Sequence, residues 1–350
     1  MATPGPVSST HRFDEAALAR YLDSQGMPGF GAGIAVRQYQ GGQSNPTFEI
    51  TAGPHRYVLR KKPPGRLLPS AHLVEREYRV MKALAGTAVP VPVMHHLCED
   101  AEVIGTPFFL MDHLDGRVVD DTSLPGTFTP DERAVIYDSM NQVLAALHQV
   151  DLAAVGLGDF GRTGAYVQRQ IDRWTRQFEA AKTDPMPDMD ALMAWLPAHV
   201  PDHDETSIVH GDFRMGNLML HPVEPRVVAV LDWELSTLGH PLSDLAYNVM
   251  PWVLPHDGTS LNGLVGLDLA AEGIPAMEAY VQAYARRTGR GVIDSFSFFL
   301  AFSCFRLASI CQGVYARGLQ GNASSDNAVE VGAKAPRLAR VGWEIARSID

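Results

Sequence analysis

Cysteine is scarce in this 350-residue sequence, which contains only Cys98, Cys304 and Cys311. No two of them form a CxxC pair, so the sequence predicts neither a zinc knuckle nor a disulfide framework. Reduced thiols are typical of cytoplasmic proteins, and we expect this chain to be one of them. The first ten residues also lack the basic and apolar regions of a secretory signal peptide.

Excess positive charge and long uncharged apolar runs are lacking as well. The formal net charge of −11 argues against binding nucleic acid or anionic lipid through a general basic surface. The longest apolar stretch, residues 296–314, contains Arg306 near its middle, which favours a buried helix over a membrane span. We therefore expect neither a nucleic acid nor a membrane among the partners of this protein.

What is present is the composition of an ordinary globular protein, with 46% hydrophobic and 20% charged residues and enough length for two lobes. Short alternating runs separated by turn residues predict hairpin-connected antiparallel strands. These runs are residues 34–36, 48–50 and 57–60. A helix is expected over residues 70–84, followed by another strand within residues 103–114.

From about residue 115 the helical pattern dominates. Thr129 as N-cap, with Pro130 next and Glu132 at the third helical position, predicts a helix that runs to about residue 149. The sequence thus indicates an α+β fold with a sheet-containing lobe before a larger, mainly helical lobe. The expected divisions are a flexible N-terminus (1–12), an N-terminal lobe (13–114) and a C-terminal lobe (115–350).

Glu77 lies at the centre of the apolar face of the helix expected over residues 70–84, near Val80 and Met81. A carboxylate in that position needs a partner, because burying an unpaired charge is costly. Arg60, on the preceding strand, is a suitable cation, and kinases use a Lys/Arg–Glu pair of this kind to hold the ATP phosphates. The alternative is that Glu77 lies at an interface and extends toward solvent.

The turn between the first two expected strands is rich in glycine and small polar residues. Gly42, Ser44 and Asn45 are candidates for contacts with phosphate oxygens, although most Gly-Gly turns are simple hairpins. Val58 projects to the same side of its strand as Arg60, so we expect Val58 to line an adenine slot.

Three side chains suited to phosphoryl transfer occur between residues 208 and 232. Asp212 follows a short apolar run, Asn217 lies shortly after it, and Asp232 ends a second apolar run. Phosphoryl transfer needs a carboxylate for the proton of the attacking hydroxyl, and an Asn and an Asp that hold Mg²⁺. A lone loop Asp is commonly a turn cap, but the other two residues argue against that alternative. Arg214 is a candidate for neutralising the transferring group or, equally, a solvated loop residue.

Histidine and arginine clusters offer further candidates. His210 is expected to pack and hydrogen-bond within the loop that carries Asp212. A metal-dependent phosphohydrolase using Asp232 and nearby histidines is an alternative, but the histidine spacing matches no zinc signature. Three arginines share one face of an expected helix, either as a solvated surface or as a docking surface for an anionic substrate. They are Arg169, Arg173 and Arg176.

The segments "IVHGDFRMGNLML" and "VVAVLDWELSTLGHPLSDLAY" resemble the signature segments of the aminoglycoside phosphotransferase and choline kinase-like superfamily. More narrowly, "GGQSNPTFEI", "YVLRKKPPGRLLPSAHLVEREYRVMKAL" and "GTPFFLMDHLDGRV" resemble the kinase-like domain that is fused to acyl-CoA dehydrogenases. The resemblance implies a bilobal, protein-kinase-like fold, with ATP and Mg²⁺ as cofactors.

The resemblance also implies roles for individual residues. Asp212 would be the catalytic base, and Asn217 and Asp232 the Mg²⁺ ligands. Arg60 and Glu77 would orient the ATP phosphates. Three further residues have implied supporting roles, namely adenine contacts through the hinge backbone (Met111, His113) and a brace below the catalytic loop (Asp244).

These residues predict a small-molecule kinase that moves the ATP γ-phosphate to a substrate hydroxyl. The resemblance links its narrower subgroup to hydroxyacyl-CoA phosphorylation, and a row of arginines suits CoA phosphates. We therefore expect a hydroxyacyl-CoA or a related metabolite as acceptor, with a functional link to an acyl-CoA dehydrogenase. The alternatives are an aminoglycoside phosphotransferase and a nucleotide-binding pseudokinase that transfers nothing.

Overall fold

The computed structural model describes residues 4–39, 45–64, 72–126, 128–258, 261–320 and 328–349. The chain divides into two compact units. The first comprises Met1–Val118, Met219–Val223 and Val228–Glu234, and the second comprises Val119–Leu218, Glu224–Val227 and Leu235–Asp350. The sequence-based boundary lies near residue 114 and assigns everything after it to one lobe. In the structure, by contrast, the segment that carries Asp232 groups with the first unit.

A five-stranded antiparallel sheet forms the centre of the first unit, in the order β1-β2-β3-β5-β4. Its strands are β1 (Ile34–Gln38), β2 (Thr47–Ala52), β3 (His55–Lys61), β4 (Met94–Cys98) and β5 (Phe108–Asp112). Strand β4 was not predicted, because its residues show no regular apolar alternation. Of residues 103–114, where a strand was expected, only Phe108–Asp112 form one, because residues 101–104 form a turn.

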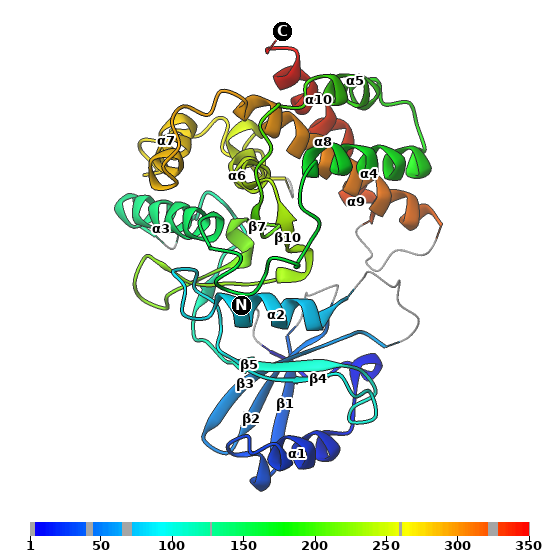
Figure 1. Ribbon diagram of the computed structural model, residues 1–350, viewed down its shortest axis with the longest axis vertical. Helices are drawn as coiled ribbons and strands as arrows, with labels where there is room; N and C mark the ends of the chain where they lie inside the picture. Colours follow the sequence, from blue (N-terminus) through cyan, green and yellow to red (C-terminus); the bar gives the residue numbers. More distant parts are fainter. Residues whose placement is uncertain are drawn as a thin grey trace. The chain divides into compact units, whose positions relative to one another are not determined.

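Two helices, α1 (Glu15–Ser24) and α2 (Val74–Leu84), cover opposite faces of this sheet (Figure 1). On the α1 face, Leu18 and Leu22 share a buried cluster with residues of β2 and β5, including Phe108. Side chains alternate along a strand, so Phe109 points to the other face and contacts Tyr78 of α2. Helix α2 begins at Val74, later than expected, and buries Glu77 on its inner side as predicted.

Two further segments attach to the first unit. Gly5 pairs with Gln38 of β1 through both backbone hydrogen bonds, and Ser9–His11 form a short 3₁₀ helix (η1), within the region that we expected to be flexible. A small sheet in the order β6-β8-β9 contains β6 (Arg117–Val118), β8 (Leu218–Leu220) and β9 (Val227–Val230). Val230 also donates its N–H to Pro90 O, which fixes the strand that leads to Asp232.

The second unit is mainly helical, as predicted. Its helices are α3 (Pro130–His148), α4 (Tyr166–Ala181), α5 (Pro187–Trp195), α6 (Pro241–Val249), α7 (Met277–Arg287), α8 (Phe296–Leu319), α9 (Ala328–Gly332) and α10 (Lys334–Ala346). The expected capping box of α3 is present between Thr129 and Glu132. Val135 of α3 is half exposed. A short antiparallel pair of strands, β7 (Ser207–Val209) and β10 (Thr237–Gly239), lies within this unit.

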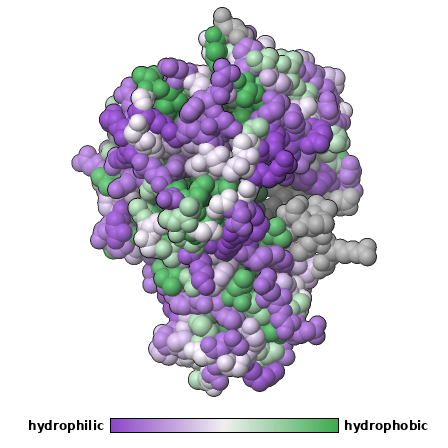
Figure 2. All heavy atoms as spheres, in the orientation of Figure 1, coloured by the Kyte–Doolittle hydropathy of each residue, from purple (hydrophilic) through white to green (hydrophobic). Residues whose placement is uncertain are grey.

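Helix α8 is the central helix of the second unit and packs against α4, α6 and α10 (Figure 1). By length and composition alone it could cross a membrane, but 72% of its most apolar window is buried inside the protein. This burial agrees with the predicted core helix. Hydrophilic residues cover most of the face of the molecule that Figure 2 shows.

Candidate active site

In the first unit, one guanidinium group holds two carboxylates. Arg60 Nε lies 3.1 Å from Glu77 Oε2, and Arg60 Nη2 lies 2.6 Å from Asp232 Oδ1. Burial alone would lower the pKa of Arg60, but Glu77 and Asp232 reverse that effect and raise it. Arg60 therefore stays charged, and the Arg60–Glu77 pair that the helical periodicity suggested is present. It also includes Asp232, from a distant part of the chain.

Asp232 has a backbone conformation that side chains rarely adopt, with φ of 64°. It directly follows β9 and Leu231, and the indole N–H of the next residue, Trp233, donates to Val230 O at 2.9 Å. Trp233 is almost fully buried and so anchors the turn. Strained positions of this kind persist only where the surroundings enforce them, and they are concentrated at functional sites.

Glu77 has two partners, one for each oxygen. Besides Arg60 it accepts a hydrogen bond on Oε1 from Asn45 Nδ2 at 2.6 Å. Burial raises the pKa of Glu77 to about 7, while Arg60 and Asn45 both act to lower it. We expected Asn45 to contact phosphate with its neighbours Gly42 and Ser44. Its side chain is buried against Glu77, and Gly42 and Ser44 lie outside the described residues, so the expected phosphate contacts of this turn stay a prediction.

The residues expected near adenine lie on β3, on β5 and just after β5. Val58 and Met111 are directly opposite each other in the antiparallel pair of these strands. His113 follows β5, and its buried imidazole contacts Glu49 at 3.3 Å and Arg56 at 2.9 Å. The His113 side chain is thus engaged within the sheet, which leaves only its backbone for the contact that the resemblance implied.

In the second unit, Asp212 and Asn217 contact each other. Asn217 Nδ2 donates to the Asp212 backbone oxygen at 2.9 Å and to Asp212 Oδ2 at 2.7 Å. Asp212 N in turn donates to His210 Nδ1 at 3.2 Å, so the buried His210 has the structural place that we expected. Gly211 between them has φ of 83°, and a Cβ there would lie 2.8 Å from Leu235 O. Only glycine suits this position.

Asp244 braces the same loop from α6. Its carboxylate accepts the backbone N–H groups of His210 at 2.5 Å and Gly211 at 2.9 Å. Burial would raise the pKa of Asp244, but the hydrogen bond and charge of His148 outweigh it, together with His210 and Gly211, and the pKa is lowered. Asp244 thus contacts the loop that carries Asp212 in the way that the resemblance implied.

Arg214 lies beside the Asp212 carboxylate, with Nε 3.6 Å from Asp212 Oδ2. Its Nη1 also pairs with Asp120 Oδ1 at 3.0 Å. Burial alone would lower the pKa of Arg214, but Asp212 first, and Asp120 with it, raise it. The Arg214–Asp120 ion pair lies against Gly216. A Cβ at this position would lie 2.0 Å from Asp120 Oδ1 and 2.3 Å from Arg214 Nη1.

Three residues of this unit escaped the sequence analysis as members of the site. Arg306 of α8 donates from Nη2 to Gly211 O at 2.6 Å, and His148 of α3 contacts Asp244 at 3.5 Å. Asp120 is the third. A charged residue inside an apolar helix was a usable signal for Arg306, whereas Asp120 has no distinguishing local pattern.

The arginines of α4 do not share a single partner. Arg169 donates to Arg162 O and Arg176 to Asp172 O, both on or beside α4 itself. The guanidinium of Arg173 lies 5.1 Å from the ring centroid of Trp174. Arg173 and Arg176 are exposed, so they remain accessible to an anionic ligand.

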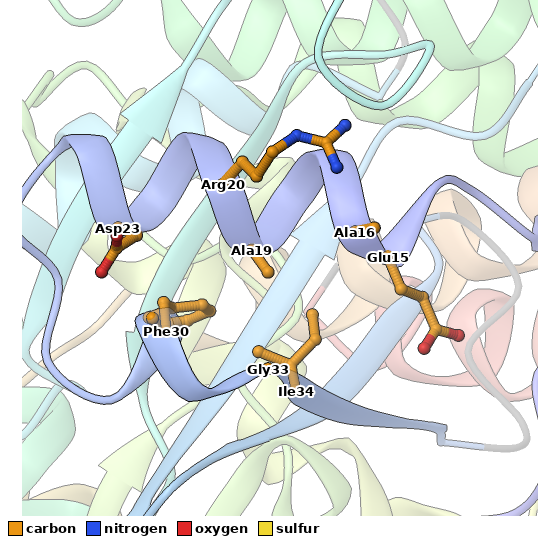
Figure 3. A pocket seen from close by; sticks show the side chains of 9 residues that line it. Glu15, Ala16, Ala19, Arg20, Asp23, Phe30, Gly33 and Ile34 are labelled. Atoms are coloured by element: carbon orange, nitrogen blue, oxygen red, sulfur yellow. The ribbon is translucent and has the colours of Figure 1, made fainter.

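The donor atoms fit a hard cation such as Mg²⁺, which prefers oxygen ligands. Because Asn217 makes both of its side-chain bonds through Nδ2, its Oδ1 accepts no hydrogen bond from the described residues. The second carboxylate oxygen of Asp232 likewise has no partner within the described part of the chain, and its side chain is 37% exposed. A hollow elsewhere in the first unit, between α1 and residues 30–34, has a volume of about 460 Å³ and contains none of the predicted site residues (Figure 3).

Comparison with known proteins gives one consistent result. Residues 35–289 match the sequence pattern of the phosphotransferase enzyme family. A crystallised Ralstonia eutropha protein, provisionally named an aminoglycoside phosphotransferase, is 50% identical, with a TM-score of 0.88 over 96% of this chain and 99% of that one. A thermostable mutant of aminoglycoside phosphotransferase APH(4)-Ia, crystallised with ADP and hygromycin B, shares the fold at 19% identity. Its TM-score is 0.60, over 93% of this chain and 99% of that one. The predicted α+β, kinase-like fold is confirmed.

Curated relatives are longer proteins. Acyl-CoA dehydrogenase family member 10 of Mus musculus is 46% identical over 343 residues, which are 97% of this chain but 32% of the relative. Acyl-CoA dehydrogenase family member 11 of Rattus norvegicus is 45% identical over 348 residues, with 97% and 44% covered. The chain thus spans 32% and 44% of the length of these two relatives, which is less than half of each.

Proposed function

Because the chain belongs to the phosphotransferase enzyme family, we propose that it transfers the γ-phosphate of ATP to a hydroxyl group of a small molecule with Mg²⁺ as cofactor. The observation that carries this proposal is the contact of Arg60 with both Glu77 and Asp232. It puts a fixed cation, suited to phosphate oxygens, beside a carboxylate suited to Mg²⁺. Crystals of APH(4)-Ia with ADP and with AMP-PNP support ATP as the donor.

Each catalytic residue has a task in this proposal. Asp212 accepts or orients the proton of the acceptor hydroxyl, and its carboxylate is kept in place by Asn217. Asn217 Oδ1 and the Asp232 carboxylate would be the Mg²⁺ ligands, and the ion would neutralise charge on the phosphates. Arg214 stabilises the negative charge of the transferring group. Its charge is assured because its pKa is raised.

The nucleotide base is proposed to lie against β3 and β5. Val58 and Met111, which face each other across these strands, supply apolar contact to adenine. His113 contributes through its backbone. The imidazole of His113 keeps the end of β5 in place through Glu49 and Arg56.

The acceptor is proposed to be a hydroxyacyl-CoA or a related metabolite. The curated relatives are named acyl-CoA dehydrogenase family members, and these names support this choice. We also propose a functional link between this protein and an acyl-CoA dehydrogenase. The exposed Arg173 and Arg176 of α4 suit the phosphate groups of CoA, whereas a polycationic aminoglycoside is bound best by carboxylates. We propose the cytoplasm as the site of action.

The test is a substrate screen. Purified protein with ATP, with and without Mg²⁺, is offered hydroxyacyl-CoAs, kanamycin, hygromycin B, choline and simple sugars, and ADP release and phosphorylated product are measured. We expect Mg²⁺-dependent product with a hydroxyacyl-CoA. Product with kanamycin or hygromycin B alone would favour the aminoglycoside alternative, which the names of the structural neighbours support. ATP binding without turnover on any acceptor would favour a pseudokinase.

A further inference from the structure

Each oxygen of the Glu77 carboxylate has its own partner, a positively charged guanidinium for one and a neutral amide for the other. Arg60 Nε contacts Oε2 at 3.1 Å, and Asn45 Nδ2 donates to Oε1 at 2.6 Å. Asn45 and Glu77 are each only 1% exposed. Asn45 is therefore a buried hydrogen-bond donor to the acid of the proposed nucleotide site, rather than a solvent-facing residue of a turn.

The orientation of the Asn45 amide is set by its other contacts. Asn45 Oδ1 lies 3.2 Å from His72 Nδ1, and because an amide oxygen only accepts, His72 is the donor in this bond. The hydroxyl of Thr47 donates to the Asn45 backbone oxygen at 3.1 Å. These contacts leave the amide nitrogen directed at Glu77, so the side chain has one favourable orientation.

Charge explains why a neutral donor occupies this position. Arg60 is near three carboxylates, at 3.1 Å from Glu77, 2.6 Å from Asp232 and 3.9 Å from Glu234. One cation compensates these acids incompletely, and burial further disfavours the charged form of Glu77. The Asn45 amide N–H stabilises the Glu77 carboxylate by a hydrogen bond. A second cation in its place would compete with Arg60 for that carboxylate. A fourth carboxylate in place of Asn45 would have the opposite effect.

We propose that Asn45 is a positioning residue of the nucleotide site. It holds Glu77 so that Glu77 aligns Arg60 for the ATP phosphates, and it does not contact the nucleotide itself. This inference rests on the proposed function, because it assumes that Arg60 binds ATP. The sequence suggested that backbone N–H groups of this turn contact phosphate, whereas the present inference concerns the side chain of Asn45.

The experiment reverses the donor and the acceptor. In Asn45→Asp, two carboxylates face each other, and the affinity for Mg-ATP measured by calorimetry should fall on the order of tenfold to a hundredfold. In the double variant Asn45→Asp/Glu77→Gln, the new amide at position 77 can donate to the new carboxylate at position 45. The number of carboxylates in the cluster is then the same as in the wild type. The double variant should bind Mg-ATP more tightly than Asn45→Asp, up to the affinity of Glu77→Gln alone, which measures the cost of losing the charge at position 77 next to Arg60.

A matched control separates this effect from the general cost of burying a charge. Asn141 of α3 is also 1% exposed, donates to Tyr280 O and accepts from Arg287, outside the proposed site. Asn141→Asp should change the melting temperature while leaving the affinity for Mg-ATP unchanged. In steady-state kinetics, Asn45→Asp should raise the KM for ATP and leave the KM for the acceptor unchanged, a split that a purely structural role would not produce.

The outcomes are distinct. Wild-type affinity in a folded Asn45→Asp variant overturns the inference and leaves the proposed function intact. A double variant that binds Mg-ATP no better than Asn45→Asp, although Glu77→Gln alone binds it well, indicates that Asn45 contacts the nucleotide directly, which also overturns the inference. If the wild-type protein binds no Mg-ATP, the proposed function fails first and the inference fails with it.

Discussion

The side-chain amide of Asn217 holds Asp212 at two points, the backbone oxygen at 2.9 Å and the carboxylate Oδ2 at 2.7 Å. Both bonds come from the same nitrogen, so the amide oxygen faces away from Asp212 and can serve a cation. The proposed base, Asp212, and the proposed metal ligand, Asn217, therefore hold each other in position. The loop from Asp212 to Asn217 ends in a short 3₁₀ helix, η4 (Met215–Asn217). A change in either residue is expected to affect both tasks.

Removing the carboxylate of Asp212 should abolish most turnover without abolishing ATP binding. In Asp212→Asn, we expect kcat to fall by roughly 10²–10⁴-fold, the usual contribution of a general base. The dissociation constant of Mg-ATP, measured by calorimetry, should change less than threefold. Asp131→Asn, at an exposed position in the first turn of α3, is the control and should retain wild-type kcat. A kcat of Asp212→Asn within a factor of two of wild type would contradict the assignment of Asp212 as the base.

Gly216 tests the role of Arg214 without altering any charge. A Cβ at position 216 would lie 2.0 Å from Asp120 Oδ1 and 2.3 Å from Arg214 Nη1, so Gly216→Ala should displace this ion pair. We expect kcat to fall about tenfold, since a displaced cation stabilises the transferring group less well. Gly158→Ala is the matched control, because a Cβ there meets no atom within 4 Å. Unchanged kcat in Gly216→Ala would indicate that Arg214 is only a loop residue.

Local patterns predicted the parts of the site that depend on periodicity. Glu77 was recognisable because helical spacing put an acid on an apolar face, and a cation on the preceding strand supplied a candidate partner. The direction of the Asn45 side chain was not predictable, because it depends on Glu77, which lies 32 residues further along the chain. Asp120 pairs with Arg214 across 94 residues for the same reason. Contacts of this kind are set by the tertiary fold, which short sequence windows do not contain.

Asp244 should make stability dependent on acid pH. Its folded pKa is lowered, so it contributes stability that is fully present above its unfolded pKa of about 4 and is lost as the pH falls through the lower folded value. Asp244→Asn should cost on the order of 2–3 kcal/mol at neutral pH, because an amide nitrogen would face the N–H groups of His210 and Gly211. Urea unfolding from pH 3 to pH 7 measures the difference between the two proteins.

The difference should be constant above about pH 5 and should shrink below pH 4. Asp190→Asn is the control, since Asp190 is exposed and its pair with Lys182 lies at the surface. That variant should stay within about 0.5 kcal/mol of wild type at every pH. A gap between Asp244→Asn and wild type that does not change with pH would contradict the lowered pKa.

Arg306 joins the core helix α8 to the loop that carries the proposed base Asp212, and its substitution should affect stability and turnover together. Arg306 is only 8% exposed, donates to Gly211 O at 2.6 Å and lies 5.5 Å from the ring centroid of Tyr247. Arg306→Met keeps much of the side-chain volume but removes the donor and the contact of the cation with the ring. We expect a loss of roughly 2 kcal/mol of unfolding free energy, because the Gly211 carbonyl loses its partner in a buried place.

The same substitution should lower kcat more than it raises the KM for ATP. Gly211 directly precedes Asp212, whereas the residues that we propose for ATP binding, Arg60 and Glu77, belong to the first unit. Arg317→Met is the control on the same helix, since Arg317 is exposed. If Arg306→Met lost stability but kept wild-type kcat in its folded fraction, Arg306 would support α8 alone. If both quantities fell while the KM for ATP stayed constant, the helix core would be shown to position the proposed base.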